Sequence, residues 1–553
     1  MVQVYCKNTK ESKRFPEGTS LLQMLSEFDC HRPYPIVSAK VNNVSQGLKF
    51  KVYQNKDIEF IDVREPSGMR VYCRSLCFLL YKAAQDAFPG SKLYMEHPIS
   101  HGYFCHLRKA DDTELTPQDV ELLAQRMREL VQKDMPFHRY DVQTDRAIKE
   151  FRKAGFADKV KLLETSGEAY TDYYTLGDTP DYFYGKLVPS TGYLTVWGIL
   201  PYHDGLLLQL PSHEDPSRVA PLQDQPRTFE VFKENLRWNI IMGLNTVGDV
   251  NEAFLHGRAS ELIQIAEALQ EKKIVKIAEE IDRRYHGEHP LQVVLITGPS
   301  SSGKTTFCKR LSIQLKACGL HPISLSTDDY FVNRADTPKF PDGSYDFDNF
   351  DTVDHALMES DIMKLLAGEE VSVPEYNFVT GLREYNGKNL QMVGGDGRIL
   401  LIEGIHALNP GLTADIPDTA KFKIFINTIT GTLLDNHNWI PTSDNRLLRR
   451  IVRDYNKGAF TARESISNWQ NVLNAEQKWI YPFQETADVM FNSAYLIEFA
   501  VLKNHAEPIL RSVPQNCPEY AEAHRLLKFI HYFTPVPDKE IPATSLLREF
   551  IGG

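Results

Sequence analysis

The pattern of apolar and polar positions changes along the 553-residue chain. In the first part, apolar side chains alternate with polar ones in VQVY, IVSAKV and DIEFIDV, and this alternation predicts strands. After the first of these stretches, GTS precedes the helical period of LLQMLSEF. We therefore expect residues 1–64 to form a small domain of strands and one helix.

Residues 65–225 have a mixed pattern, with helical periods in LCFLLYKAAQDAF, TPQDVELLAQRMRELVQKD and TDRAIKEFRKAGF. Thr116 followed by Pro117 gives the second of these helices a cap and a proline in its first turn. The pattern of residues 226–287 is almost wholly helical, as in ELIQIAEALQEKKIVKIAEEIDRR. This part is expected to be a helical connector.

Residues 288–515 alternate apolar stretches with helical ones. The strand candidates are LQVVLI, PISLS, ILLI, FKIFI and ADVMF. Such alternation is typical of a parallel sheet with crossover helices. In the tail, residues 516–553, PEYAEAHRLLKFIHYF predicts a helix packed on the body. The whole chain is therefore predicted to be a multidomain α/β protein.

Composition narrows the class of protein. Hydrophobic residues are 42% and charged residues 24%, and the formal net charge is −11, so the chain has no overall basic field. This charge argues against a protein built mainly to coat nucleic acid. A local RNA site stays compatible with it, because one patch can be basic while the whole chain is acidic. The sequence starts without an apolar signal core, and no window approaches the ~18 apolar residues of a membrane helix. We expect a cytoplasmic protein without membrane contact.

The cysteines and histidines allow two interpretations. Cys73 and Cys77 with Cys105 and His106 suit a metal site, but one-turn spacing within CRSLCFLL is also what a packed helix face gives, and we favour packing. The eight cysteines include no CxxC pair, which is typical of buried thiols in a reducing compartment. The polar groups of HPISHGYFCH are interpreted as structural: His97, His101, Cys105 and His106.

The stretch GPSSSGKTT fits the pattern GxxxxGK[ST] and lies between a predicted strand and a predicted helix. Backbone N–H groups of such a loop turn toward phosphate oxygens, Lys304 reaches the β and γ phosphates, and the Thr305 hydroxyl binds Mg²⁺. ATP and Mg²⁺ are therefore the expected cofactors. The predicted ATP-binding residues are Gly298, Ser300, Ser301, Ser302, Gly303, Lys304, Thr305 and Thr306.

Two carboxylates follow later strands. Asp328 in STDDYF lies at the carboxyl edge of the predicted sheet, where it can accept a hydroxyl proton during phosphoryl transfer. A turn cap is the alternative for it or for its neighbour Asp329. Glu403 ends the buried stretch ILLIE and is expected to orient Mg²⁺ or its water, the alternative being an ordinary carboxylate at a strand end.

Arginines in DNRLLRRIVRD recur at i, i+3, i+4 and i+7, so they share one face of a helix. Near a phosphate loop this face is interpreted as a lid that clamps the transferring phosphates. A solvated face balanced by nearby aspartates is the alternative. The four residues are Arg446, Arg449, Arg450 and Arg453.

Taken in order, GPSSSGKTT, LSTDDYF, YDFDNFDTVD, PEYNFVTGLR, ILLIEGI and DNRLLRRIVRD resemble the motifs of the uridine kinase family, which is related to phosphoribulokinase, over residues 288–512. The resemblance implies that Asp328 activates the ribose 5′-hydroxyl and that Asp348, beside Phe347, holds the ribose hydroxyls. It also implies further site residues: Tyr376 and Phe378 at the base, Arg383 closing that motif, and lid arginines at Arg446, Arg449 and Arg453.

Two departures from the family pattern concern the acceptor and the lid. Gly381 stands where pyrimidine-specific members have a histidine that reads the base, which removes a hydrogen-bond partner from the acceptor site. The Arg-Gly-Arg expected after the arginine helix is replaced by Lys457, Gly458 and Ala459. Kinase chemistry is therefore better supported than uridine as the acceptor.

The N-terminal part resembles two other modules. Residues 1–64 resemble a TGS domain, and residues from about 65 to 210 resemble the editing-type second domain of threonyl-tRNA synthetase, as in CRSLCFLLYKAA and DYFYGKLVPSTGYL. The synthetase domain uses the two histidines of an HxxxH motif and a later cysteine and histidine. At the corresponding positions this chain has Arg74, Phe78, Phe183 and Leu187. None of these side chains can serve as a general base or metal ligand, so we expect no editing. The fold would bind a partner, regulate the kinase or only pack against it.

Three functions follow as hypotheses. The leading one is ATP-dependent phosphoryl transfer to the 5′-hydroxyl of a nucleoside, uridine-like or cytidine-like. The second keeps the kinase but takes a sugar phosphate, as phosphoribulokinase does. The third is an ATP-switched regulatory protein that contacts tRNA or another RNA through residues 1–225. The expected small-molecule partners are ATP and the acceptor, and an oligomer is compatible with the sequence.

Overall fold

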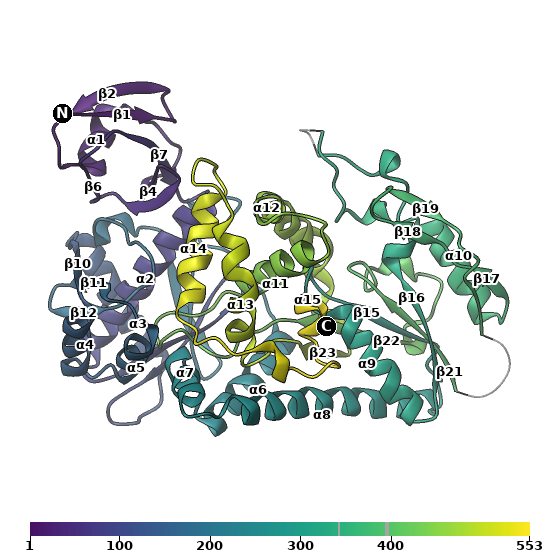
Figure 1. Ribbon diagram of the computed structural model, residues 1–553. Coiled ribbons are helices and arrows are strands. Elements are labelled where there is room, and N and C mark those ends of the chain that lie inside the picture. The colour runs from purple at the N-terminus through teal and green to yellow at the C-terminus, as the bar shows by residue number, and fades with distance from the viewer. Residues whose placement is uncertain (341–342, 393–396, 553) are drawn as a thin grey trace.

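The computed structural model describes residues 1–340, 343–392 and 397–552. Figure 1 shows an N-terminal sheet domain, a second region of helices and sheets beside it, and a C-terminal region built on a parallel sheet. This is the multidomain α/β architecture that the sequence predicts. The predicted domain boundaries stay proposals, and Gly553, the last residue of the predicted tail, lies outside the described residues.

The N-terminal sheet domain is a five-stranded sheet of order β2-β1-β7-β4-β5 with one helix packed on it. Strands β1 and β7 are parallel, and β7 is the central strand of the sheet. Ser20 begins the helix in a reciprocal capping box with Gln23. The elements are β1 (Val2–Cys6), β2 (Glu11–Phe15), β3 (Thr19–Ser20), α1 (Leu21–Glu27), β4 (Ile36–Val41), β5 (Val44–Gly47), β6 (Lys51–Val52) and β7 (Lys56–Asp62).

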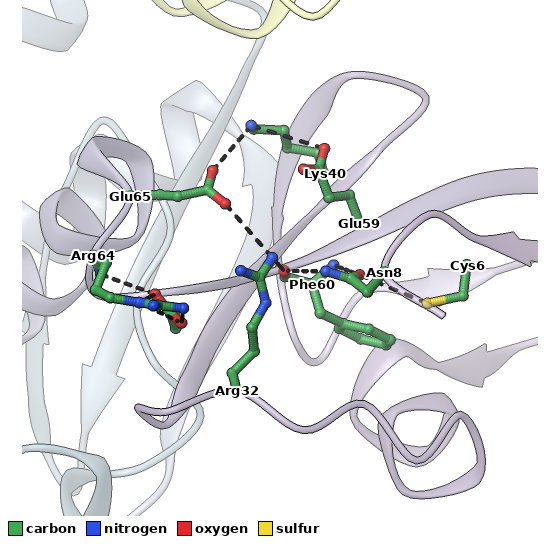
Figure 2. Close-up of polar contacts among 9 residues, drawn as sticks. Cys6, Asn8, Arg32, Lys40, Glu59, Phe60, Arg64 and Glu65 are labelled. Carbon is green, nitrogen blue, oxygen red and sulfur yellow. Dashed lines mark hydrogen bonds and ion pairs between the residues drawn. The ribbon is translucent and has the colours of Figure 1, made fainter. Parts of the chain in front are cut away.

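Positively charged side chains near the end of β7 form ion pairs with carboxylates. Figure 2 shows Glu65 between Lys40 and Arg32, at 3.2 Å and 3.7 Å. Arg64 Nη2 lies 2.7 Å from Oδ2 of buried Asp62. Because these three cations have carboxylate partners, this corner offers little unpaired positive charge to a nucleic acid.

The second region surrounds α2 (Pro66–Ala87), which is buried along most of its length. One sheet has the order β13-β14-β9-β8 and a smaller one the order β10-β11-β12. Thr116 caps α3 with Pro117 in the first turn, as the sequence predicts. The elements are β8 (Lys92–Ile99), β9 (Gly102–Arg108), α3 (Pro117–Gln132), β10 (Phe137–Gln143), α4 (Thr144–Lys153), α5 (Ala157–Ser166), β11 (Tyr170–Leu176), β12 (Thr179–Asp181), β13 (Gly198–Tyr202) and β14 (Gly205–Gln209).

The connector consists of α6 (Pro226–Met242), α7 (Val247–Leu255) and α8 (Ala259–Tyr285). In Figure 1, α8 runs below the C-terminal region from the side of the second region. Near its start, Leu262 and Ile263 are buried in the core that contains α2. Near its end, Ile277 and Ile281 are buried in the core under the parallel sheet. One helix therefore joins two hydrophobic cores.

The C-terminal region contains a parallel sheet of order β16-β21-β15-β22-β23, with crossover helices. The five strands lie where the apolar stretches predict them. The elements are β15 (Val293–Thr297), α9 (Lys304–Ala317), β16 (His321–Ser326), α10 (His355–Leu366), β21 (Arg398–Glu403), β22 (Lys421–Asn427), α11 (Thr442–Asn456), α12 (Ala462–Trp479), β23 (Val489–Asn492) and α13 (Glu498–Arg511). One hairpin pairs β18 (Glu375–Asn377) with β19 (Leu382–Glu384), and the strands on either side of it, β17 (Glu370–Ser372) and β20 (Asn389–Gln391), pair antiparallel with each other.

The tail contributes α14 (Tyr520–His531) and the short α15 (Arg548–Ile551). Helix α14 lies beside α13, facing the second region (Figure 1). Its Glu522 accepts a hydrogen bond from Arg70 of α2 at 2.8 Å, and its Arg525 pairs with Asp444 of α11 at 2.6 Å. The tail therefore contacts both large regions. Within the described ranges, no helix is both long and apolar enough to span a membrane.

A buried ionic cluster joins the second region to residues 428–441, the loop between β22 and α11. Lys159 Nζ lies 2.7 Å from Asp435 Oδ1 and 3.0 Å from Asp181 Oδ1, and His437 Nδ1 lies 2.8 Å from Asp181 Oδ2. Burial alone would lower the pKa of Lys159, but attraction to the two aspartates raises it above its ordinary value. The loop that leads into α11 is thus fixed on the second region by charge.

Replacing Lys159 by Met should lower the free energy of unfolding by about 3–5 kcal/mol, because two buried carboxylates lose their cation. Lys161→Met is the matched control, since that lysine is 40% exposed and pairs with Asp249 and Glu252 at the surface. Its loss should cost about 0–1 kcal/mol. Urea unfolding followed by circular dichroism measures both, and equal small losses would contradict the assignment.

Candidate active site

The phosphate loop between β15 and α9 has the conformation of an anion-binding loop. Ser301 and Gly303 have φ of 60° and 87°, which turns successive N–H groups toward one side. A Cβ at Gly298 would lie 2.3 Å from the carbonyl oxygen of Ile426, so the close approach of β22 requires glycine there. Lys304 Nζ folds back and donates to two carbonyl oxygens of the loop at 3.0 Å and 3.1 Å.

Two predicted carboxylates gather near Lys304. Asp328 follows β16 and Glu403 ends β21, and these strands are neighbours whose carboxyl ends share one edge of the sheet. Burial raises the pKa of Asp328, opposed by attraction to Lys304 and Arg453. Burial, together with repulsion from Asp328, raises the pKa of Glu403 to about 7. Two carboxylates beside one ammonium group favour the binding of a cation.

Thr305 and Glu403, the predicted metal pair, lie close together. Thr305 Oγ1 donates to Glu403 Oε1 at 3.4 Å, and Ser326 Oγ donates to the same oxygen at 3.2 Å. A hydroxyl and a carboxylate are the oxygen ligands that Mg²⁺ takes together with water and substrate phosphates. In the described part of the chain, His, Cys, Asp and Glu form no group of three able to hold a metal.

Two arginines of helix α11 donate hydrogen bonds to carbonyl groups of the phosphate loop. Arg446 Nη1 donates to the Ser300 carbonyl oxygen at 3.2 Å, and Arg449 Nη1 donates to the Ser301 carbonyl oxygen at 3.3 Å. Both arginines are almost fully buried. Two N–H groups of the loop also have acceptors within the protein: Ser300 N–H donates to Glu476 Oε1 at 2.9 Å, and Ser302 N–H donates to the Pro299 carbonyl oxygen at 3.2 Å.

Glutamates of two other helices neutralise these arginines. Arg446 pairs with Glu476 of α12 at 2.5 Å and lies 5.3 Å from the Trp469 ring, and Arg449 pairs with Glu498 of α13. The expected lid of four arginines is thus corrected, since these two are buried in ion pairs rather than free to close over a ligand. Their catalytic roles stay predictions.

Arg450 and Arg453 are the partly exposed members of the arginine face. Arg450 Nη1 donates to Ser300 Oγ at 3.1 Å, and its charge opposes the rise in the pKa of Asp348 that burial causes. The charge of Arg453 acts in the same way on Asp328. Both guanidinium groups also pair with Asp454, at 3.4 Å and 2.8 Å, so part of their charge is balanced. Arg450 was absent from the predicted catalytic set, although its spacing placed it on the same face.

The residues predicted to hold the base belong to the β18–β19 hairpin. Tyr376 is buried, with its ring 5.5 Å from Phe331 and 5.0 Å from Phe378. Phe378 is 61% exposed, so its ring is available to a ligand. Arg383, which closes the motif, is paired with Asp354 at 2.8 Å. The hairpin thus offers an aromatic surface, and the charge of this arginine is already neutralised.

Asp348 and Phe347 lie in the segment before α10. Burial raises the pKa of Asp348 to about 6, although attraction to Arg450 opposes this rise. Phe347 is 39% exposed. Repulsion from Asp328 also contributes to the raised pKa of Asp348, so the predicted base and the predicted ribose ligand act on each other electrostatically.

In the second region, the four residues at the editing positions fill one core. The rings of Phe78 and Phe183 are 5.6 Å apart, and Arg74 donates to the carbonyl oxygen of Lys186 at 3.2 Å. Leu187 follows directly and is 4% exposed. Phe78, Phe183 and Leu187 belong to the same hydrophobic core. Apolar side chains occupy the space, and no general base is among them.

The nearby histidine and cysteine residues are mostly buried. His97 stacks on Phe232 at 5.0 Å, and burial lowers its pKa to about 3. Burial raises the pKa of the Cys73 thiol to about 12. A neutral imidazole and a protonated thiol suit packing, which is how the sequence was interpreted.

Sequence reasoning missed three glutamates at this site. Glu476 and Glu498 hold the buried arginines, and Glu549 of the tail accepts from Thr306 N–H at 3.1 Å and from its hydroxyl at 2.8 Å. Each comes from a helix distant in sequence from the motif that it serves. Their spacing carries no signal, because isolated acidic residues are common on helices.

A phosphate-binding loop followed by carboxylates at the strand ends defines the class of P-loop nucleotide-binding proteins. Residues 293–496 match the model of the Phosphoribulokinase / Uridine kinase family, which confirms the resemblance seen in the motifs and supports a P-loop kinase. A solved structure described as a possible uridine kinase from Bacillus stearothermophilus is 18% identical, with a TM-score of 0.28, covering 40% of this chain and 98% of that one.

The N-terminal part matches threonine–tRNA ligases. The ligase of Carboxydothermus hydrogenoformans is 26% identical over 191 residues, which cover 34% of this chain and 30% of the ligase. The ligase of Syntrophotalea carbinolica is 30% identical over 180 residues, covering 32% and 28%. The chain thus spans less than a third of the length of these relatives.

Replacing Glu476 by Gln should lower the free energy of unfolding by about 3 kcal/mol, because Arg446 would keep its buried charge without a partner. Glu464→Gln on the same helix is the control, since glutamine also serves its capping box with Thr461. That change should stay within about 0.5 kcal/mol. Denaturant unfolding measures both, and a neutral Glu476→Gln would show that the pair does not hold α11.

Proposed function

We propose that the protein is an ATP- and Mg²⁺-dependent kinase that phosphorylates the 5′-hydroxyl of a nucleoside or a similar ribosyl compound. The observation that carries this proposal is the position of Asp328. It lies at the end of β16, within the electrostatic reach of Lys304 in the phosphate loop, and burial raises its pKa. A carboxylate with a raised pKa beside a phosphate-binding lysine is suited to accept a proton from an attacking hydroxyl.

In the proposed mechanism, Asp328 accepts the proton of the acceptor hydroxyl while the hydroxyl oxygen attacks the γ-phosphorus in line. The bond between the γ-phosphorus and the β–γ bridging oxygen breaks, and ADP leaves with that oxygen. Lys304 and the two partly exposed arginines, Arg450 and Arg453, stabilise the negative charge that spreads over the transferring group. Asp348 holds the ribose hydroxyls and the aromatic hairpin holds the ring. Bound Mg²⁺, held by Thr305 and Glu403, would neutralise phosphate charge. Most of the rate would come from positioning.

Replacing Asp328 by Asn should lower kcat by about 10²–10⁴-fold while leaving ATP affinity within about twofold, because only the proton acceptor is removed. Asp329→Asn is the matched control, since Asp329 lies 3.6 Å from Lys388 and is assigned no role in transfer. The assay is ADP release across nucleosides and pentose derivatives. If the protein binds ATP but none of these compounds stimulates its turnover, the proposal is contradicted.

A second candidate acceptor is a sugar phosphate, and Arg334 favours it. Gly381 has φ of 73°, and a Cβ there would lie 2.7 Å from Arg334 Nε, so a guanidinium group packs where related kinases have a histidine. Arg334 Nη2 donates to the Phe378 carbonyl oxygen at 2.6 Å. Among the described residues, the buried Nε of Arg334 has no hydrogen-bond partner. An unpaired guanidinium suits an anionic acceptor group.

Replacing Arg334 by Gln should separate the two acceptors. If the acceptor is anionic, KM for the sugar phosphate should rise at least about tenfold, because a charge-assisted hydrogen bond is lost, while KM for neutral nucleosides stays unchanged. The measurement is the same ADP-release assay with one substrate of each class. Equal changes for both classes, or a wild-type preference for neutral nucleosides, would reject the sugar-phosphate acceptor.

Contact with tRNA through residues 1–225 is a third hypothesis, supported by the match to ligases that act on tRNA by name. The paired cations around Glu65 reduce the charge available for it on one corner. Cytoplasmic location stays a prediction from the sequence.

A further inference from the structure

The end of the tail packs against the phosphate loop. In Figure 1 the C-terminus lies beside β15 and α9. Leu546, Leu547 and Phe550 are almost fully buried, and the Phe550 ring lies 4.8 Å from the guanidinium carbon of Arg449. Asn456 of α11 donates to the Phe550 carbonyl oxygen at 3.2 Å. Residues 545–551 are therefore a docked part of the fold rather than a loose end.

Within this segment, Glu549 reaches the N-terminus of α9. That helix begins at Lys304, and Gly303 at its cap position supplies no side chain. Glu549 Oε2 accepts from Thr306 N–H at 3.1 Å and from Thr306 Oγ1 at 2.8 Å. A carboxylate from the far end of the chain thus caps the helix of the phosphate loop, where the partial positive charge of the helix favours an anion.

The same helix N-terminus is where a phosphate loop binds the phosphates of a nucleotide. The Thr306 N–H is a single donor, so Glu549 and a phosphate oxygen cannot both take it at full strength. The charge of Glu549 also acts on Lys304 and Glu403, the residues expected to meet the phosphates and Mg²⁺. Glu549 of the tail therefore occupies the Thr306 N–H, a donor that the phosphates of the proposed nucleotide would bind.

We propose that Glu549 is an internal competitor of the nucleotide: it binds the N-terminus of α9 when the site is empty and rotates away when nucleotide phosphate arrives. This inference rests on the proposed nucleotide site. Because Leu546, Leu547 and Phe550 anchor the segment, the side chain moves and the backbone stays. The apparent nucleotide affinity is then the intrinsic affinity reduced by the fraction of molecules in which Glu549 is displaced.

The test is the affinity of the full-length protein for ADP, with and without Mg²⁺, by titration calorimetry at fixed ionic strength. Glu549→Ala should bind ADP about 5- to 30-fold more tightly than wild type, the range expected from losing one capping contact. Glu549→Gln keeps an oxygen acceptor but loses the charge, so its gain should be smaller. Glu540→Gln, an exposed carboxylate of the same tail, should match wild type.

A second readout separates competition from a purely structural cap. Without nucleotide, Glu549→Ala should melt at a lower temperature than wild type, yet saturating ADP should raise its melting temperature by more. If Glu549 were only a cap, the variant would melt lower while its ADP affinity stayed unchanged, and the inference would be overturned. Weaker ADP binding in the variants would overturn it as well.

These outcomes are distinguishable from failure of the proposed kinase. If Glu549→Ala tightens ADP binding but no acceptor supports turnover, the competitor stands and the kinase proposal fails. If all proteins bind ADP equally and turn over acceptor, the kinase stands and the competitor fails. If wild type and both Glu549 variants bind no ADP, both fail, because there is no nucleotide to exclude.

Discussion

The buried pairing of Arg446 with Glu476 and of Arg449 with Glu498 is the interaction on which the phosphate loop depends. Taking guanidinium and carboxylate groups out of water is costly, and a buried ion pair is weak evidence of stability by itself. Here each arginine also donates to a loop carbonyl, so the pair determines where the loop lies. These two ion pairs and the two hydrogen bonds to loop carbonyls thus fix helices α11, α12 and α13 and the phosphate loop relative to one another.

Helix α11 carries these arginines and is itself held at both ends by other parts of the chain. Before it, residues 428–441 are fixed on the second region through Asp435 and His437. Along it, Asp444 pairs with Arg525 of α14, and Asn456 bonds to the end of the tail. The second region, whose core contains Phe78 and Phe183, therefore helps to hold the segment that leads into α11.

Local patterns predicted what depends on neighbours in sequence. The strands of the parallel sheet, the cap of α3 at Thr116 and the phosphate loop follow from alternation, capping and spacing within short windows. The arginine spacing predicted a shared face, but its burial depends on glutamates in α12 and α13. Residues 428–441 show no helical or strand period, so their docking on the second region had no sequence signal. Ion pairs between residues distant in sequence could not be predicted from the local patterns.

The charge balance of the site links the cation and the tail. Asp328, Glu403 and Glu549 surround Lys304, and burial and mutual repulsion already raise the pKa of Glu403 to about 7. A triphosphate would add several negative charges to this low-dielectric space, where like charges repel more strongly than in water. Under the proposed function, a divalent cation near Thr305 and Glu403 and the departure of Glu549 from α9 would therefore both favour nucleotide binding at neutral pH. Each change lowers the cost of the other, since both reduce the negative charge that the phosphates meet.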